Sequence, residues 1–482
     1  MTDQARPPFS QHPDAAAREN ALAEAVELAL PASIADLTDL VRIPSVSWAA
    51  FDPAHVLQSA EAVAELFRGT GVFDEVQIKR ASTGSASSTE QGELGQPAVL
   101  ARRAAKNGRP TVLLYAHHDV QPPGAEADWE SPAFEPTVRG DRLYARGAAD
   151  DKAGVISHLA AIRALQQIAG ADFDLGIVAF IEGEEEFGSR SFAHFLDDNR
   201  DALAADVIVV ADSDNWDTVT PSLTISLRGN VTFRLTVSTL AHASHSGMFG
   251  GAVPDAMLAA IRLLSTLHDE NGSVAVEGLT SRPVDTPEYT EQTLRDETGL
   301  LEGVQPIGTG SILSRLWAGP SITVTGIDAP TVANASNTLI PSVSVRVSAR
   351  IAPGQDAGEA YEALVAHLRA NAPFGAQVEI DDVDTGSPFL VDTSGWAVTA
   401  AKDAMRDAWG AEPVEAGIGG SIPFVADLVR VFPEAQILVT GVEDPHTRAH
   451  SPNESLHLGV FKRAIATEAL LLLRMNDRSG NE

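Results

Sequence analysis

Cysteine is absent from this chain of 482 residues. Its absence excludes disulfide bonds, thiolate metal ligands and cysteine nucleophiles, so any metal site must be built from His, Asp and Glu. Basic residues are also scarce, because 34 Lys and Arg stand against 66 Asp and Glu and leave a formal net charge of −32. An acidic surface repels phosphate backbones, so the composition argues against a nucleic-acid partner.

Long apolar runs are missing as well. No stretch reaches the ~18 apolar residues of a membrane-spanning helix, so we expect no membrane insertion. Residues 1–20 also lack the basic start and apolar core of a signal peptide. These absences favour a cytoplasmic protein. The length, in contrast, is ample for two or more domains.

Most of the chain has the pattern of an α/β protein. Short continuous apolar runs are typical of strands buried on both faces of a parallel sheet, and they occur at 111–115, 175–181, 207–211 and 437–440. Helices are predicted at 20–43, 152–168, 189–203 and 396–408. The Ser/Gly-rich segment 81–96 is predicted to be a mobile loop. We expect a catalytic domain with a mostly parallel central sheet.

A second pattern begins near residue 228, where apolar and polar residues alternate. Alternation indicates a sheet with one covered face and one exposed face. The predicted order has strands at 230–239, 321–326, 342–351 and 376–383 and helices at 254–268 and 357–371. That β-α-β-β-α-β order is ferredoxin-like, and segment 270–320 within it stays unassigned. We therefore predict an α+β domain at 228–387, inserted between two parts of the catalytic domain, 1–227 and 388–482.

Acidic and histidine side chains follow the predicted strands of the larger domain. They are His117 with Asp119, the run Glu184–Glu186, Asp212, His450, and Asp150 with Asp151 directly before a helix. The carboxyl ends of parallel strands open onto one crevice, so residues from distant parts of the chain are expected to meet there. Taken singly, each group has a structural explanation, such as a helix start, a turn cap or a surface histidine.

Crowded carboxylates repel one another and raise each other's pKa values, so their convergence favours a bound cation. Histidine nitrogens with carboxylate oxygens suit zinc, with manganese and cobalt as competitors. Two such ions can share a bridging carboxylate and lower the pKa of a water molecule. A carboxylate that does not bind the metals would then accept the proton of that water.

Six motifs resemble one known family. They are YAHHDVQPPG (115–124), LYARGAADDKAG (143–154), EGEEEFGS (182–189), SHSGMFGG (244–251), GGSIP (419–423) and AHSPNE (449–454). In this order they resemble the carnosinase-like dipeptidases, part of the wider family of aminoacylases, glutamate carboxypeptidases and succinyl-diaminopimelate desuccinylases. The resemblance runs from about residue 20 to the end. It implies a zinc-peptidase-like catalytic domain and an inserted lid that also mediates dimerisation.

The resemblance implies a role for each residue of the metal site. His117 and Asp212 would bind one zinc ion, Glu186 and His450 the other, and Asp150 would bridge both. Manganese or cobalt could replace zinc.

It also implies that Glu185 is the general base and acid. Asp119 would hydrogen-bond His117 and fix its tautomer, and His118 would not be a ligand. The peptide bond between Asp150 and Asp151 would be cis.

The inserted domain is implied to contribute the substrate contacts of a homodimer. His245 would reach the partner subunit's active site and polarise the scissile carbonyl, with His242 as a rival. Arg350 and Thr338 of this domain would grip the substrate, together with Gly420 and Ser421 from the second part of the catalytic domain. This chain departs from the family at Gly417 and Ile418, where many dipeptidases have Arg and Glu, so a cationic contact is missing.

The expected function is the metal-dependent hydrolysis of dipeptides or short peptides. An N-acyl-amino-acid deacylase would use the same water and the same ligands, so the motifs leave that alternative open. A metal-dependent peptide-binding protein without turnover is a further alternative, but it would have no need of the base Glu185.

Overall fold

The computed structural model describes residues 14–84, 93–420 and 423–478. Residues 85–92 of the predicted mobile loop therefore lie outside the described residues. The chain divides into two compact units. The first comprises Met1–Ile225, Val391–Ala416 and Asp427–Glu482, and the second Ser226–Leu390 with Gly417–Ala426. The predicted insertion, 228–387, falls inside the longer segment of the second unit, whereas residues 417–426 were not expected to group with it.

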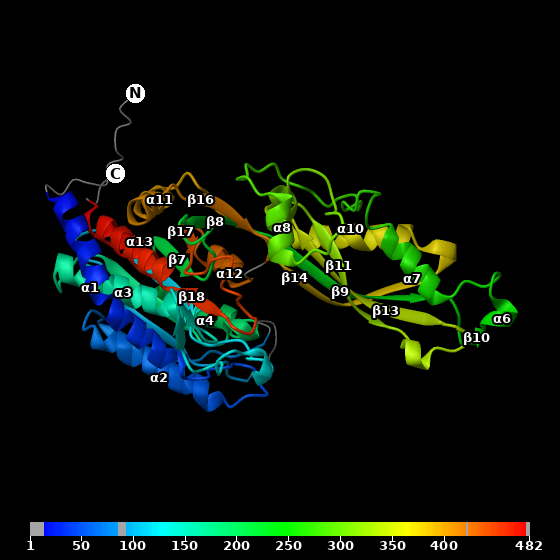
Figure 1. Cartoon of the computed structure of the whole chain (residues 1–482), viewed down its shortest axis with the longest axis horizontal. Coiled ribbons are helices and arrows are strands. Elements are labelled where there is room, and N and C mark those ends of the chain that lie inside the picture. The colour runs from blue at the N-terminus through cyan, green and yellow to red at the C-terminus, as the bar shows by residue number, and fades with distance from the viewer. Residues whose placement is uncertain (1–13, 85–92, 421–422, 479–482) are drawn as a thin grey trace, which may run out of the picture. The chain divides into compact units, whose positions relative to one another are not determined.

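A mixed sheet forms the centre of the first unit, with strand order β1-β2-β6-β3-β7-β17-β8. Its strands β7, β17 and β8 are labelled in Figure 1. Neighbours among β6, β3, β7 and β17 are parallel, whereas the pairs toward both margins are antiparallel. The strands are β1 (Glu75–Lys79), β2 (Ala98–Arg103), β3 (Thr111–His117), β6 (Gly176–Glu182), β7 (Val207–Ala211), β8 (Ser222–Leu227) and β17 (Gln436–Thr440), and β16 (Val414–Ile418) also pairs with β8. The predicted α/β class with a largely parallel centre is confirmed.

Helices bury the strands of this sheet. The longest are α1 (Ala15–Val41), α2 (Pro53–Gly69), α3 (Lys152–Ala169), α11 (Trp396–Trp409) and α13 (Leu458–Asp477). Helix α3 packs against both α1 and α13, which explains why all of its residues from 152 to 162 are buried. Among the described helices, none is long and apolar enough to cross a membrane.

Shorter elements complete the unit. They are α4 (Phe192–Asp198), α5 (Arg200–Leu203), α12 (Pro423–Val431), η1 (Glu126–Asp128), η2 (Glu185–Phe187) and a small sheet of β18 (Ser455–His457), β5 (Arg142–Tyr144) and β4 (Thr137–Arg139). The single helix predicted at 189–203 is wrong, because the chain is interrupted at Asn199, which ends α4 and begins α5. Asparagine favours such caps because its side chain competes for backbone hydrogen bonds.

The second unit contains an antiparallel sheet with strand order β11-β13-β9-β14. Its strands are β9 (Gly229–Ser238), β11 (Ser321–Asp328), β13 (Ser342–Ile351) and β14 (Gln377–Gly386), and its helices include α7 (Ala256–Ser265) and α10 (Ala357–Ala370). Alternate residues of β9 and β13 are buried against α7 and α10. This is the predicted ferredoxin-like order. Segment 270–320, left unassigned above, contains α8 (Glu291–Thr298) and α9 (Ile312–Trp317).

Smaller elements complete the second unit. They are the strand pair β10 (Ser244–His245) and β12 (Thr338–Leu339), the helical turns α6 (Ser246–Phe249), η3 (Val332–Asn334) and η4 (Pro373–Gly375), and β15 (Phe389–Leu390), which pairs with Ser226 and Leu227.

Candidate metal centre

Three neighbouring strands of the first unit end in potential metal ligands or lead directly to them. His117 is the last residue of β3, and it lies opposite Glu182, the last residue of β6. Asp212 follows β7 directly. Strands β6 and β7 pair with β3 in parallel, so their carboxyl ends lie at one edge of the sheet.

Asp150 joins the side chains at this edge into two groups. One Asp150 oxygen is 3.2 Å from Nε2 of His117, and the other is 3.0 Å from Nε2 of His450. The same His450 nitrogen is 3.2 Å from a Glu186 oxygen. Two sets have ligand atoms that all lie within 4.8 Å of one another, His117 with Asp150 and Asp212, and Asp150 with Glu186 and His450. The structure therefore brings together all five predicted ligands, with Asp150 in both sets.

The hydrogen bonding of His117 fits a metal ligand. Burial lowers the pKa of this ring, but its contacts with the carboxylates of Asp119 and Asp150 outweigh that effect and raise the pKa well above the usual range, so a metal ion at this position would displace a proton. Nδ1 of His117 lies 3.1 Å from the backbone carbonyl oxygen of Asp119, which can only accept a hydrogen bond, so in the neutral ring Nδ1 carries the proton. Nε2 then presents a lone pair. In the neutral ring this buried nitrogen cannot donate to the Asp150 carboxylate oxygen 3.2 Å away. A divalent cation would satisfy it.

The carboxylates of the site are crowded in a buried setting. Burial and the neighbouring negative charges of Asp212 and Glu186 outweigh the attraction of His117 and raise the pKa of Glu185 well above its usual range. Burial, with the charge of Asp150, raises the pKa of Glu186 to about 7. Positive charge at the centre would allow these acids to ionise together.

The histidines lower the pKa of Asp150 more strongly than that of Asp212. Burial raises the pKa of Asp212 to about 6 despite the opposing charge of His117. Burial also acts on Asp150, but its hydrogen bonds with His117 and His450 outweigh that effect and hold its pKa below the usual range. Asp150 is therefore the carboxylate most strongly held in its charged form.

Asp119 fixes the turn that carries the glutamates. Its two carboxylate oxygens accept the backbone N–H groups of Glu185 and Glu186, each at 3.1 Å, and one also accepts the hydroxyl of Ser47 at 2.7 Å. Asp119 hydrogen-bonds His117 as expected, but through its backbone carbonyl oxygen, while its nearer carboxylate oxygen is 3.4 Å away. The carboxylate is already engaged by three donors.

Glu185 lies beside the ligand sets without belonging to either. A Glu185 oxygen is 4.0 Å from Nε2 of His117. His118, which was not expected to be a ligand, points elsewhere, since its Nε2 lies 2.9 Å from the Pro97 carbonyl oxygen and burial lowers its pKa to about 4. The peptide bond between Asp150 and Asp151 is cis, as the resemblance implied.

The predicted substrate-binding residues belong to the second unit. His245 pairs with Thr338 across β10 and β12. Its Nδ1 accepts the N–H of Gly247 at 3.0 Å, so the neutral ring carries its proton on Nε2, where it can be donated. Its rival His242 places Nδ1 3.0 Å from the carbonyl oxygen of Ala243. Arg350 lies in β13, whereas Ser421 is outside the described residues.

The departure from the family at Gly417 has a steric reason. A Cβ atom at this position would lie 2.7 Å from Cβ of Trp317, so the tryptophan leaves no space for an arginine. A cation is nevertheless present at the loop. The guanidinium of Arg228 donates to the carbonyl oxygen of Gly419 at 2.9 Å, and burial, with the charge of Arg350, lowers its pKa to about 10.

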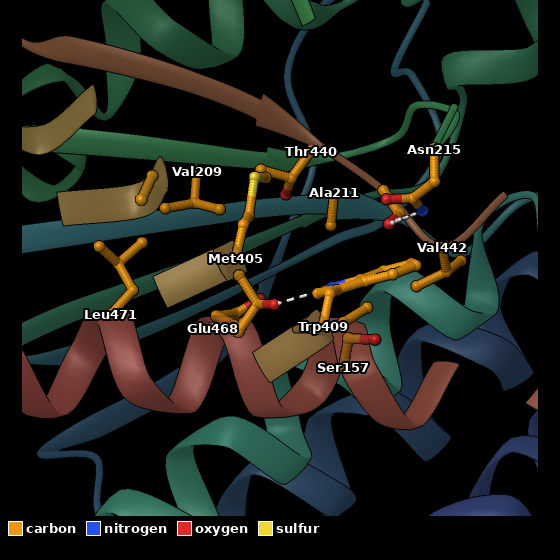
Figure 2. A pocket seen from close by; sticks show the side chains of 14 residues that line it. Ser157, Val209, Ala211, Asn215, Met405, Trp409, Thr440, Val442, Glu468 and Leu471 are labelled. Atoms are coloured by element: carbon orange, nitrogen blue, oxygen red, sulfur yellow. Dashed lines mark hydrogen bonds between the residues drawn. The ribbon is translucent and has the colours of Figure 1, made fainter. Parts of the chain in front are cut away.

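A small pocket of the first unit is distinct from the metal centre (Figure 2). It is lined mainly by apolar side chains, including Val209 of β7, Met405 and Trp409 of α11 and Leu471 of α13. Its volume of about 30 Å³ suits a water-sized group, whereas ligand pockets measure ~300–1,000 Å³. None of the five predicted ligands lines it, so it is packing space within the fold.

Comparison with known proteins extends these observations. Residues 113–474 match the peptidase family M20/M25/M40. A cysteinylglycine-S-conjugate dipeptidase of Corynebacterium striatum is 37% identical over 369 residues, which cover 76% of this chain and 81% of that protein. A Cys-Gly metallodipeptidase of Schizosaccharomyces pombe is 28% identical over 448 residues, covering 89% and 92%. The fold is shared with human carnosine dipeptidase 1, at 22% identity and a TM-score of 0.74 over 95% of this chain and 98% of that one.

Proposed function

The chain belongs to peptidase family M20/M25/M40, and from this premise we propose that it hydrolyses dipeptides with two zinc ions and Glu185 as the general base. Relatives named as dipeptidases cover most of its length, which favours peptide-bond hydrolysis over the deacylase and binding-protein alternatives. The observation that carries the proposal is the position of Asp150 in both ligand sets.

The metal ligands are assigned by these two sets. His117 and Asp212 would hold one ion, Glu186 and His450 would hold the other, and Asp150 would contribute to both positions. Nitrogen and carboxylate ligands suit zinc, and manganese or cobalt fit the same donors. When bound, the ions lower the pKa of a water molecule and polarise the scissile carbonyl.

Glu185 moves the proton. The Asp119 carboxylate holds the backbone N–H of Glu185, which fixes the start of its turn, and its side-chain oxygen lies 4.0 Å from His117. From this position its carboxylate accepts a proton from the attacking water and returns it to the leaving amine. Because Glu185 binds neither ion in this assignment, it is free to change its protonation.

The substrate class is tested by a panel of dipeptides, tripeptides and N-acyl amino acids offered to zinc-loaded protein. We expect dipeptides to be cleaved with the highest kcat/KM, because the named relatives are dipeptidases. Parallel metal analysis of the purified protein should find two ions per chain. Faster cleavage of N-acyl amino acids than of any dipeptide would establish the deacylase instead.

The second unit is proposed to act as a lid and as the contact of a homodimer. Strand β11 is an edge of its sheet, and most of its residues are exposed, including Val324 and Ile327. An exposed edge invites pairing with a second copy of the same strand. In the proposed dimer, His245 donates from Nε2 to the scissile carbonyl in the partner's site, with Thr338, Arg350, Gly420 and Ser421 holding the substrate.

Complementation tests the action of His245 across the dimer. We expect Glu185→Gln and His245→Ala proteins to be inactive alone, and to regain activity when mixed under conditions that exchange subunits. Some mixed dimers then contain one site with both groups intact. If activity in the mixture stays at the level of the separate variants while subunit exchange is demonstrated by a size or label assay, His245 acts within its own chain.

A further inference from the structure

Glu454 is a buried carboxylate that the sequence motifs contained but to which they gave no role. It lies four residues beyond His450, and its exposed fraction is 0%. Its two oxygens accept hydrogen bonds from Nη1 of Arg146 at 2.6 Å and from the backbone N–H groups of Gly147 at 3.0 Å, Ala149 at 3.0 Å and Asp150 at 3.2 Å. Four donors therefore converge on one carboxylate.

The position of these donors connects Glu454 with the metal centre. Asp150, whose own N–H is held, is the residue common to both ligand sets. The guanidinium of Arg146 also reaches back to the loop of His450, where its Nη2 donates to the carbonyl oxygen of Ser451 at 3.4 Å. One carboxylate thus ties the backbone that carries Asp150 to the loop that carries His450.

The loop of His450 needs such support. His450 has a φ of +62°, a left-handed conformation that side chains with a Cβ rarely adopt. Its side chain is 58% exposed, so packing holds it weakly. The loop is closed at its base by the N–H of Ser455, which donates to the carbonyl oxygen of Thr447 at 2.9 Å.

We propose that Glu454 is a positioning residue that sets the separation between Asp150 and His450, and hence the affinity of the metal centre. The inference rests on the proposed metal-dependent hydrolysis. Residues that orient metal ligands typically change metal affinity by about 10–100-fold when they are replaced. Glu454 acts through Asp150 and His450, and it takes no part in proton transfer.

The test is a chelator-competition titration of zinc with the full-length Glu454→Gln protein. The Gln side chain offers one acceptor oxygen and two N–H donors to a site that already has four donors. We expect zinc affinity to fall by about 10–100-fold, and activity to return in excess zinc because Glu185 remains intact. Unchanged zinc affinity in a folded Glu454→Gln protein would overturn the inference.

A matched control is available in the same two segments. Asp444 accepts a hydrogen bond from Arg142, so this pair also joins the two segments. Among the described residues, however, the Asp444 carboxylate accepts no hydrogen bond from the backbone N–H of Asp150, which donates to Glu454. Asp444→Asn is expected to lower the melting temperature without changing zinc affinity. An equal loss of affinity in Asp444→Asn would mean that weakening any contact between these two segments lowers zinc affinity, which overturns a specific role for Glu454.

A second variant tests the inference if the first variant does not fold. If Glu454→Gln is unfolded by circular dichroism, Glu454→Asp keeps the charge but is one methylene too short to reach Arg146 and the Asp150 N–H together. It should also weaken zinc binding, and wild-type affinity in that variant would refute the inference. Failure of the proposed function is a separate result, because the wild-type protein would then bind no zinc or cleave no dipeptide.

Discussion

Replacing Glu185 with Gln is expected to lower kcat by about 10²–10⁴-fold while both metal ions stay bound. The amide has nearly the shape of the carboxylate but cannot accept the proton of the attacking water. The turn survives, because Asp119 binds the backbone N–H of residue 185, which the substitution leaves in place. The measurements are steady-state kinetics in excess zinc and metal analysis of the same sample.

Glu186→Gln is the comparison that separates base from ligand. Glu186 is held by Gln121, whose backbone N–H and side-chain amide donate to its two oxygens at 3.0 and 2.7 Å. Its replacement should lower metal content, and excess zinc should recover part of the activity. If Glu185→Gln loses the metal and Glu186→Gln keeps it without turning over, the roles of the two glutamates are exchanged.

Removal of the metals is expected to abolish activity, and zinc, cobalt or manganese should restore it. Without the ions, the carboxylate of Asp150 lies against the rings of His117 and His450, and no Lewis acid remains to activate water at neutral pH. The measurement is activity after dialysis against a chelator and after each metal is returned. Full activity in protein shown to be metal-free would contradict the mechanism.

Asp150→Ala provides the corresponding variant. Because Asp150 belongs to both ligand sets, its loss should weaken both metal positions, whereas Asp212→Ala should weaken only the set that contains His117. Metal content measured over a range of free zinc concentrations distinguishes one weakened position from two. Equal behaviour of the two variants would argue against a bridging role for Asp150.

Much of the site followed from the ends of apolar runs. The runs at 111–115, 175–181 and 207–211 predicted β3, β6 and β7, and parallel strands place their carboxyl ends at one edge. This reasoning required His117, the Glu184–Glu186 turn and Asp212 to be neighbours, whatever connects them. The individual roles came only from the family resemblance, because spacing alone does not distinguish Glu185 from Glu186.

The rest depended on contacts that have no periodicity in the sequence. Glu454 acts through backbone N–H groups some 300 positions earlier in the chain, and any acidic residue in a loop looks alike until the loops are placed. Trp317 lies in the unassigned segment 270–320, so its conflict with a side chain at Gly417 could not be foreseen. Similarly, the choice between the carbonyl and the carboxylate of Asp119 as the partner of His117 is a matter of tenths of an ångström.

The position of β17 between β7 and β8 affects how the protein folds while it is being synthesised. Strands β7 and β8 leave the ribosome long before Gln436–Thr440. The place of β17 between them therefore stays empty while the whole of Ser226–Leu390 is being synthesised. That intervening segment has its own core and can fold first. The gap between β7 and β8 is filled, and His450 joins Asp150 and Glu186, only after residues 436–450 have been synthesised. Metal loading is therefore expected to follow the synthesis of residues 436–450. A chain stopped before β17 should expose an unpaired strand edge that chaperones or proteases recognise.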